Sequence, residues 1–162
     1  MAKRLTAKTV AHPDLLPVEG TGRRGSGSLS RQVKHMSRKA ITTPKSKPIG
    51  PYSAAVASGD FVHISGQIPL DAATGKLVGG DIAAQATQCR ENLKAILDAA
   101  GLGFGNVVKT TIFLMDLGDF QAVNGVYAKY MSEPYPARST IQVAGLPMGA
   151  RVEIEMIAYS GK

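Results

Sequence analysis

The last segment of the chain predicts a strand with two different faces. Between residues 152 and 159 the side chains alternate in character, and successive side chains of a strand point to opposite sides of its sheet. The first face is entirely apolar and consists of Val152, Ile154, Met156 and Ala158. The second face mixes charged and apolar side chains, which are Glu153, Glu155, Ile157 and Tyr159. Helices should therefore cover the first face, while the second is suited to meeting another subunit, with a ligand pocket at the seam.

Two helices that could provide this cover are predicted upstream. Asp81 is a good N-cap, and Gly101 ends a segment in which apolar side chains recur at three- and four-residue spacings. This apolar stripe consists of Ile82, Ala86, Cys89, Leu93, Ile96 and Ala100. Asp119 can cap a second helix, which ends before Pro134. Its apolar face consists of Phe120, Val123, Tyr127 and Tyr130.

Short β-rich runs bounded by turn residues predict the strands. They lie at about 52–58, 61–66, 107–114, 138–144 and 151–159, and residues 67–80 are predicted to form a loop. The resulting order is ββαβαββ. Two helices with one apolar stripe each can cover one face of a mixed sheet, so we expect a compact α+β domain.

The basic residues are concentrated at the N-terminus. Residues 1–35 hold seven Lys and Arg against two acids, whereas residues 36–162 hold twelve against ten. We expect residues 1–38 to form a flexible leader and residues 39–162 to form the folded domain. The leader could be an organelle transit peptide, a native tail, or an addition from cloning, since His35-Met36 resembles a common cloning junction. The lack of an amphipathic arginine helix favours the last two origins over targeting.

The composition argues against several classes of protein. No apolar run is long enough to cross a bilayer, and the lone Cys89 permits no intrachain disulfide, which fits a cytoplasmic protein. Outside the leader His63 is the only histidine, and one His with one Cys makes no familiar zinc site. Neither a Walker A sequence nor a GxSxG elbow occurs, so we expect neither a metal nor a cofactor. The near-neutral folded part argues against nucleic acid as a partner, because phosphate binding needs clustered cations.

The motif YPARST at residues 135–140 carries the most chemical information. Arg138 starts one predicted strand, and its planar fork matches the two oxygens of a ligand carboxylate. Glu153, in the strand that follows and is expected to lie next to it, could hold or activate a water. This pair suggests hydrolysis of a small carboxylic acid. The alternative for Arg138 is a structural ion pair with Glu153 or Glu155.

Three further positions have both a functional and a structural interpretation. Tyr52 could lay its ring or hydroxyl against a ligand, or it could seal the edge of the core. Ser65 and Gly66 end a strand where a backbone N–H can approach a ligand, or they form an ordinary strand exit. Asn124 could donate an amide hydrogen bond from the second helix, or it could be a solvated surface amide.

Seven short segments in register resemble the Rid (reactive intermediate deaminase) family, also called YjgF-like or endoribonuclease L-PSP proteins. The likeness covers about residues 39–160. The segments are IGPYS at 49–53, SGQIP at 65–69, DIAAQ at 81–85, NLKAIL at 92–97, VKTTIF at 108–113, PARS at 136–139 and VEIE at 152–155.

The resemblance implies a chorismate-mutase-like fold and a homotrimer with a central β-barrel, helices outside and clefts between subunits. It also implies hydrolysis of enamine and imine acids, 2-iminobutanoate and 2-iminopropanoate, to 2-keto acids and ammonia. Two alternatives share this scaffold, because fold alone does not fix function. One is a non-catalytic trimeric binder or sensor of small carboxylates, and the other is an endoribonuclease or translation inhibitor.

The resemblance also implies a role for each matching position. Arg138 would bind the substrate carboxylate and Glu153 would position the attacking water. The pocket would be shaped by residues from two subunits, namely Tyr52, Ser65, Gly66, Asn124 and Thr140. Thr140 stands where many members have cysteine, so a thiol-based role is excluded and the position would act through its backbone.

Overall fold

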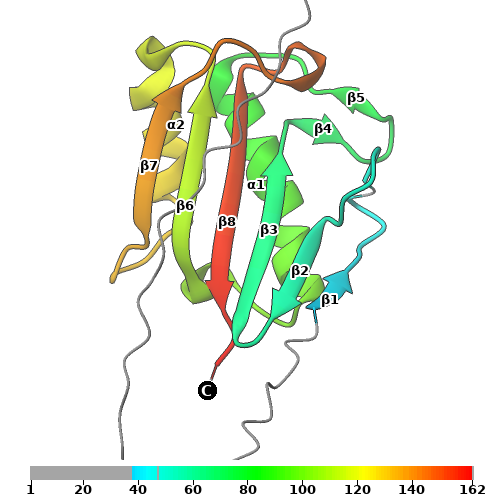
Figure 1. Ribbon diagram of the computed structural model, residues 1–162. Helices are drawn as coiled ribbons and strands as arrows, with labels where there is room; N and C mark the ends of the chain where they lie inside the picture. Colours follow the sequence, from blue (N-terminus) through cyan, green and yellow to red (C-terminus); the bar gives the residue numbers. More distant parts are fainter. Residues whose placement is uncertain (1–37, 47, 162) are drawn as a thin grey trace, which may run out of the picture. The chain divides into compact units, whose positions relative to one another are not determined.

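A six-stranded mixed sheet is the framework of the domain (Figure 1). The computed structural model describes residues 38–46 and 48–161. The strands in spatial order are β1 (Arg38–Ile41), β2 (Ala55–Ser58), β3 (Phe61–Gln67), β8 (Val152–Tyr159), β6 (Val107–Leu114) and β7 (Ala137–Gln142). β6 and β7 run parallel, and the other neighbouring pairs are antiparallel.

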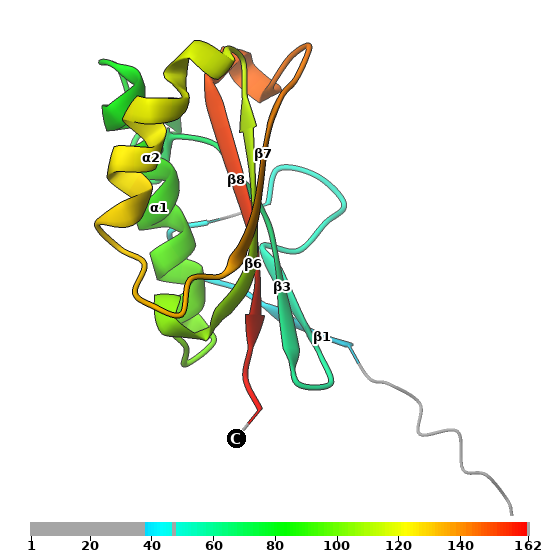
Figure 2. The same ribbon diagram turned by 90° about the vertical axis from the view of Figure 1, so that its left-hand side faces the viewer.

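Two helices, α1 (Ile82–Ala99) and α2 (Phe120–Ala128), cover one face of this sheet (Figure 2). The predicted N-cap of α1 is confirmed, because Asp81 Oδ1 accepts a hydrogen bond from the backbone N–H of Ala84 at 2.8 Å. The predicted apolar stripe of α1 is buried against the sheet. The expected α+β arrangement, with both helices on one face, is therefore confirmed. None of the described helices is long and apolar enough to cross a membrane.

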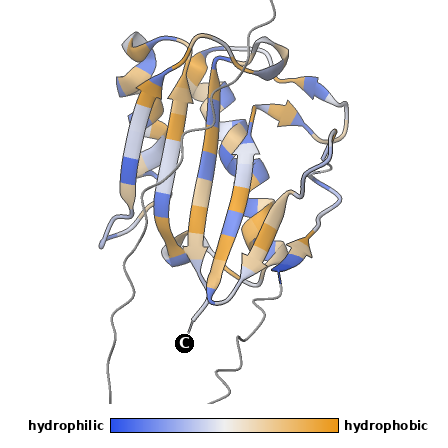
Figure 3. Cartoon of the chain, in the orientation of Figure 1, coloured by the Kyte–Doolittle hydropathy of each residue, from blue (hydrophilic) through white to orange (hydrophobic). Residues whose placement is uncertain are grey.

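Burial alternates along β8, so the strand has the two faces that its sequence predicts. Figure 3 shows hydrophilic positions between the hydrophobic ones of this strand. Its apolar face is at most 2% exposed and consists of Val152, Ile154, Met156 and Ala158. These side chains join those of α1, α2, β3 and β6 in the core, whose burial is the main driving force for folding. On the other face Glu153 and Ile157 are only half-buried, and Tyr159 is exposed.

The strands differ from the sequence-based expectations in three respects. The four-residue strand β1 pairs with β2, and the predicted loop 67–80 contains a hairpin of β4 (Leu70–Asp71) and β5 (Lys76–Leu77). Strands of two to four residues are too short to show a period, so the sequence gives little signal for them. β2 starts three residues later than predicted, after a turn in which Tyr52 N donates to the Gly50 carbonyl. Apart from Arg38, the predicted leader lies outside the described residues.

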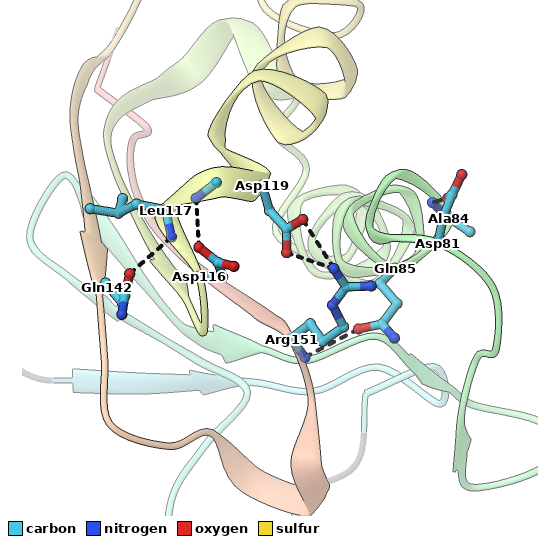
Figure 4. Close-up of polar contacts among 9 residues, drawn as sticks. Asp81, Ala84, Gln85, Asp116, Leu117, Asp119, Gln142 and Arg151 are labelled. Atoms are coloured by element: carbon cyan, nitrogen blue, oxygen red, sulfur yellow. Dashed lines mark hydrogen bonds and ion pairs between the residues drawn. The ribbon is translucent and has the colours of Figure 1, made fainter.

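Asp119 is the N-cap residue of α2, as predicted, but its side chain makes no capping hydrogen bond. Its carboxylate instead accepts two hydrogen bonds from Nη2 of Arg151, at 3.0 and 2.8 Å (Figure 4). The capping hydrogen bond here is made by the side chain of Asp116, which opens a short 3-10 helix, η2 (Leu117–Asp119), that leads into α2. The first N–H of η2 donates to Gln142 Oε1 at the end of β7. These contacts fix the start of α2 relative to β7, where several predicted site residues lie.

Candidate active site

Arg138 lies on β7 and points toward α2, on the helix-covered face of the sheet. Its register partner on β6 is Thr110, which is fully buried, and register partners share a face. Nη1 of Arg138 donates to Oδ1 of Asn124 at 2.8 Å. Cζ of Arg138 lies 4.7 Å from the ring centroid of Tyr127 and 5.6 Å from that of Phe120. One amide and two rings of the same helix therefore hold the guanidinium.

Arg138 keeps one edge of its guanidinium available for a ligand. Among the described residues it makes no ion pair, so the alternative of a structural bridge to Glu153 or Glu155 is wrong. Nε and Nη2 have no hydrogen-bond partner in the described part of the chain and are not fully buried. Two adjacent N–H donors of this kind match the two oxygens of a carboxylate.

Thr140 is the next residue of β7 on the same face as Arg138, opposite the buried Ile112 of β6. Its hydroxyl oxygen is buried and has no hydrogen-bond partner among the described residues. Leaving such a group unpaired costs about 1–3 kcal/mol, so a partner from a ligand or another subunit would be stabilising.

Glu153 lies on the opposite face of the sheet. Its register partner on β6 is Phe113, and the neighbouring Ile154 is the residue of β8 that points into the core. Partial burial, and secondly the negative charge of Glu155, raise the pKa of the Glu153 carboxyl above its ordinary value. A carboxyl whose pKa is raised can exchange protons closer to neutral pH, as a general acid or base requires.

The carboxylate of Glu153 lies against the backbone of Gly66. The register of β3 shifts between Ile64 and Gln67, so Gly66 lies in an irregular stretch beside β8. A Cβ atom built on Gly66 would overlap Oε1 of Glu153. Glycine is therefore required here for a close approach of side chain to backbone.

A cavity of about 300 Å³ is lined by Gly66 and Tyr52. Tyr52 is 51% exposed, and its hydroxyl accepts the backbone N–H of Ile49 at 3.4 Å. The Ser65 hydroxyl donates to the Ser53 carbonyl at 2.7 Å, which ties the end of β3 to the segment carrying Tyr52. The rest of the lining mixes polar and apolar side chains, including Lys45, Gln67, Ile68, Leu70 and Asn92.

The predicted site residues thus form two groups on opposite faces of the sheet. The arginine half-site consists of Asn124, Arg138 and Thr140. The glutamate half-site consists of Tyr52, Ser65, Gly66 and Glu153. The expectation that the strands of Arg138 and Glu153 are neighbours is wrong, because β6 lies between β7 and β8. Within one chain, Arg138 and Glu153 therefore do not face the same small molecule.

Phe120 and Tyr127 contact Arg138 but are missing from the sequence-based prediction of the site. Their seven-residue spacing places both on the apolar face of α2, which predicts core packing alone. Tyr127 is indeed buried, and its hydroxyl donates to Oγ1 of Thr110 at 3.2 Å. The signal that could identify them is an amide, Asn124, placed between two aromatic residues on the same helix.

The described residues contain no group of three or more His, Cys, Asp or Glu that could hold a metal ion. Cys89 is buried, and its Sγ donates to the Val152 carbonyl at 3.7 Å. Burial raises the pKa of its thiol, so little nucleophilic thiolate forms. Cys89 is therefore a packing residue, as its place on the α1 stripe predicts.

A mixed sheet with two helices on one face, and with an arginine between sheet and helix, defines a small α+β domain. The sequence model of the family described as Endoribonuclease L-PSP matches residues 42–160. The chain therefore belongs to this family, which is the Rid family of the sequence resemblance.

Named relatives agree with this assignment. The chain is 53% identical over 131 residues to Protein DfrA of Myxococcus xanthus, covering 79% of this chain and 100% of that protein. It is 48% identical over 125 residues to the human 2-iminobutanoate/2-iminopropanoate deaminase, covering 76% of this chain and 91% of the relative. The crystal structure of Escherichia coli TdcF with bound serine matches with a TM-score of 0.71 and 43% identity, over 76% of this chain and 99% of TdcF.

Proposed function

We propose that the chain hydrolyses reactive enamine and imine acids, such as 2-iminobutanoate and 2-iminopropanoate, to 2-keto acids and ammonia. The observation that carries the proposal is the accessible Nε–Nη2 edge of Arg138, which suits a small carboxylate. Two relatives support this substrate class. One is named as a deaminase of these imino acids, and TdcF was crystallised with serine, a small molecule that bears a carboxylate.

The proposed reaction needs little more than orientation. Arg138 binds the substrate carboxylate, and Glu153 accepts a hydrogen bond from a water beside the imine carbon. The water oxygen bonds to that carbon while one water proton passes through Glu153 to the imine nitrogen, which leaves a C–N single bond. The second water proton then passes to the nitrogen as the C–N bond breaks, so that a C=O group and ammonia remain. Holding the two reactants together makes such a step effectively unimolecular, which is worth several orders of magnitude in rate. The raised pKa of Glu153 suits it to passing protons between water and amine.

The two half-sites lie on opposite faces of the sheet, so we propose that each complete site forms between two copies of the chain. The sheet face without helices offers exposed or half-buried apolar side chains, namely Phe61, Ile141, Ile157 and Tyr159. Three copies related by a threefold rotation, as a homotrimer, would bury this face around a central barrel. This arrangement would also bring the arginine half-site of one copy to the glutamate half-site of the next. In this proposal residues 39–162 suffice for activity in the cytoplasm, without a cofactor or a nucleic acid.

The proposal is tested by generating 2-iminobutanoate with a threonine dehydratase and following the release of ammonia. Wild type should accelerate the release, and Arg138→Ala should not. A wild-type rate equal to that of Arg138→Ala would remove the proposal. Saturable calorimetric binding of 2-oxobutanoate without acceleration would instead identify a binder of small carboxylates.

A further inference from the structure

The guanidinium of Arg138 rests on two aromatic rings to which the proposed reaction assigns no role. We propose that Tyr127 and Phe120 are positioning residues that present the Nε–Nη2 edge of Arg138 to the substrate carboxylate. The inference rests on the proposed function, since it concerns the same site.

The first step of the argument is the freedom of the arginine side chain. Arginine has many rotamers, and a single hydrogen bond from Nη1 to Asn124 fixes one nitrogen without fixing the plane of the guanidinium. Rings at 4.7 and 5.6 Å from Cζ attract the cation and limit how that plane can tilt. Because Nη1 bonds to Asn124 and the rings lie beside the guanidinium, the Nε–Nη2 edge is the one left to bind a ligand.

The second step is that the nearer ring is itself held in place. Tyr127 is buried, and its hydroxyl donates to Oγ1 of Thr110, the register partner of Arg138 on β6. The contacts therefore run from β7 to α2 and back to β6, the strand beside β7. Phe120 is farther from Cζ and only partly buried, so its contribution should be the smaller of the two.

The chain offers a matched control in a second arginine that stacks on aromatic rings. Arg90 on α1 lies over the rings of Phe104 and Tyr130, with Cζ at 4.6 Å from the centroid of Phe104. Its side chain is 1% exposed, and it belongs to neither half-site. Phe104→Leu therefore removes a ring from a stacked guanidinium without touching the proposed site.

The test measures kcat and KM for 2-iminobutanoate, and the calorimetric Kd for 2-oxobutanoate, on the full-length chain. Tyr127→Leu should raise KM and Kd by about 5- to 20-fold, with a smaller change in kcat, because the cation–π contact is lost. Phe120→Leu should raise KM and Kd by about 2- to 5-fold. Tyr127→Phe keeps the ring and should raise both constants by less than about 3-fold. Phe104→Leu should leave both constants at the wild-type value.

A double-mutant cycle separates positioning from general damage to the fold. If the rings act through Arg138, Tyr127→Leu should not weaken 2-oxobutanoate binding further in an Arg138→Ala background. Equal losses of affinity in both backgrounds, or a wild-type Kd in Tyr127→Leu, would overturn the inference. If Tyr127→Leu does not fold, Phe120→Leu takes its place in the same cycle. Because Kd is measured without turnover, a protein that binds but does not deaminate would defeat the proposed function and still test this inference.

Discussion

The two half-sites of this domain are built in different ways. In the arginine half-site the guanidinium is held by a hydrogen bond to Asn124 and by two rings of α2, with the helix covering that face of the sheet. In the glutamate half-site Glu153 is half-buried, lies against the backbone of Gly66, and makes no hydrogen bond or ion pair with another described residue. The arginine half-site is fixed before a ligand arrives, whereas the charged group of the glutamate half-site lacks a partner.

This difference indicates a division of labour in the proposed reaction. A fixed guanidinium suits recognition of a carboxylate, because little conformational entropy remains to be lost on binding. A carboxyl with a raised pKa and a free oxygen suits proton transfer.

Mixing two inactive variants should have the largest effect, because it tests whether the half-sites of different chains meet. Arg138→Ala and Glu153→Gln should each lose activity by about 100-fold or more, since each removes one half of the machinery. Co-expressed and purified as mixed trimers, the two variants should regain about a third of the wild-type activity, because in a closed ring of three that holds both variants one copy's intact arginine meets the next copy's intact glutamate at about one interface in three.

The measurement is the rate of ammonia release by oligomers purified through two different tags, one on each variant. A mixture in which each oligomer carries a single variant is the control, and it should stay inactive. Doubly tagged oligomers that are no more active than either parent would show that the half-sites do not combine between chains.

Gly66→Ala should impair the glutamate half-site alone. The new Cβ would overlap Oε1 of Glu153, so the carboxylate must move away from its present position. This displacement should lower kcat by about 10-fold, because misplacing a catalytic group by about 1 Å can cost 10²-fold in rate. The Kd for 2-oxobutanoate should change little. Gly79→Ala is the matched control, since a Cβ there meets nothing within 4 Å. A fall in affinity equal to the fall in kcat would contradict the division between the half-sites.

Most of the fold could be predicted from the sequence because its elements have clear periods. The α1 stripe and the alternation along β8 each bury a continuous apolar surface, and the structure confirms both. The sequence could not predict that β6 lies between β7 and β8, because strand order depends on how the whole sheet packs. It could not show the role of Tyr127 either, because an aromatic residue on a buried helix face has the same pattern whether it packs against leucine or against arginine.

The glutamate half-site should also have a signature in the dependence of stability on pH. The pKa of Glu153 is raised in the folded state above its ordinary value of 4.5, so the folded state holds this proton to higher pH than the unfolded state does. Stability should therefore fall as the pH rises from about 4.5 through the raised pKa, because over that range folding favours the protonated form. Urea denaturation from pH 4 to 8 should show this fall in wild type and not in Glu153→Gln. A difference between the two proteins that does not vary with pH would refute it.

The smallest effect should come from the arginine that resembles Arg138 but lies outside both half-sites. Arg90 is 1% exposed, and its three guanidinium nitrogens have no hydrogen-bond partner within residues 38–46 and 48–161. Burial lowers the pKa of Arg90 to about 10, which indicates that keeping the buried group charged costs free energy. Arg90→Met keeps most of the volume and removes the buried charge, while the lost attraction to the Phe104 and Tyr130 rings partly offsets the gain.

Arg90→Met should therefore raise the free energy of unfolding by about 1 kcal/mol and leave the deaminase rate unchanged. Arg138→Met should abolish the activity, although both substitutions take a cation from a pair of aromatic rings. The same urea titrations and ammonia assays check both variants. A loss of stability in Arg90→Met would mean that the attraction of the two rings fully offsets the free-energy cost of removing the guanidinium from water. In that case the accessible edge of Arg138, rather than its aromatic setting, would be the feature that distinguishes it from Arg90.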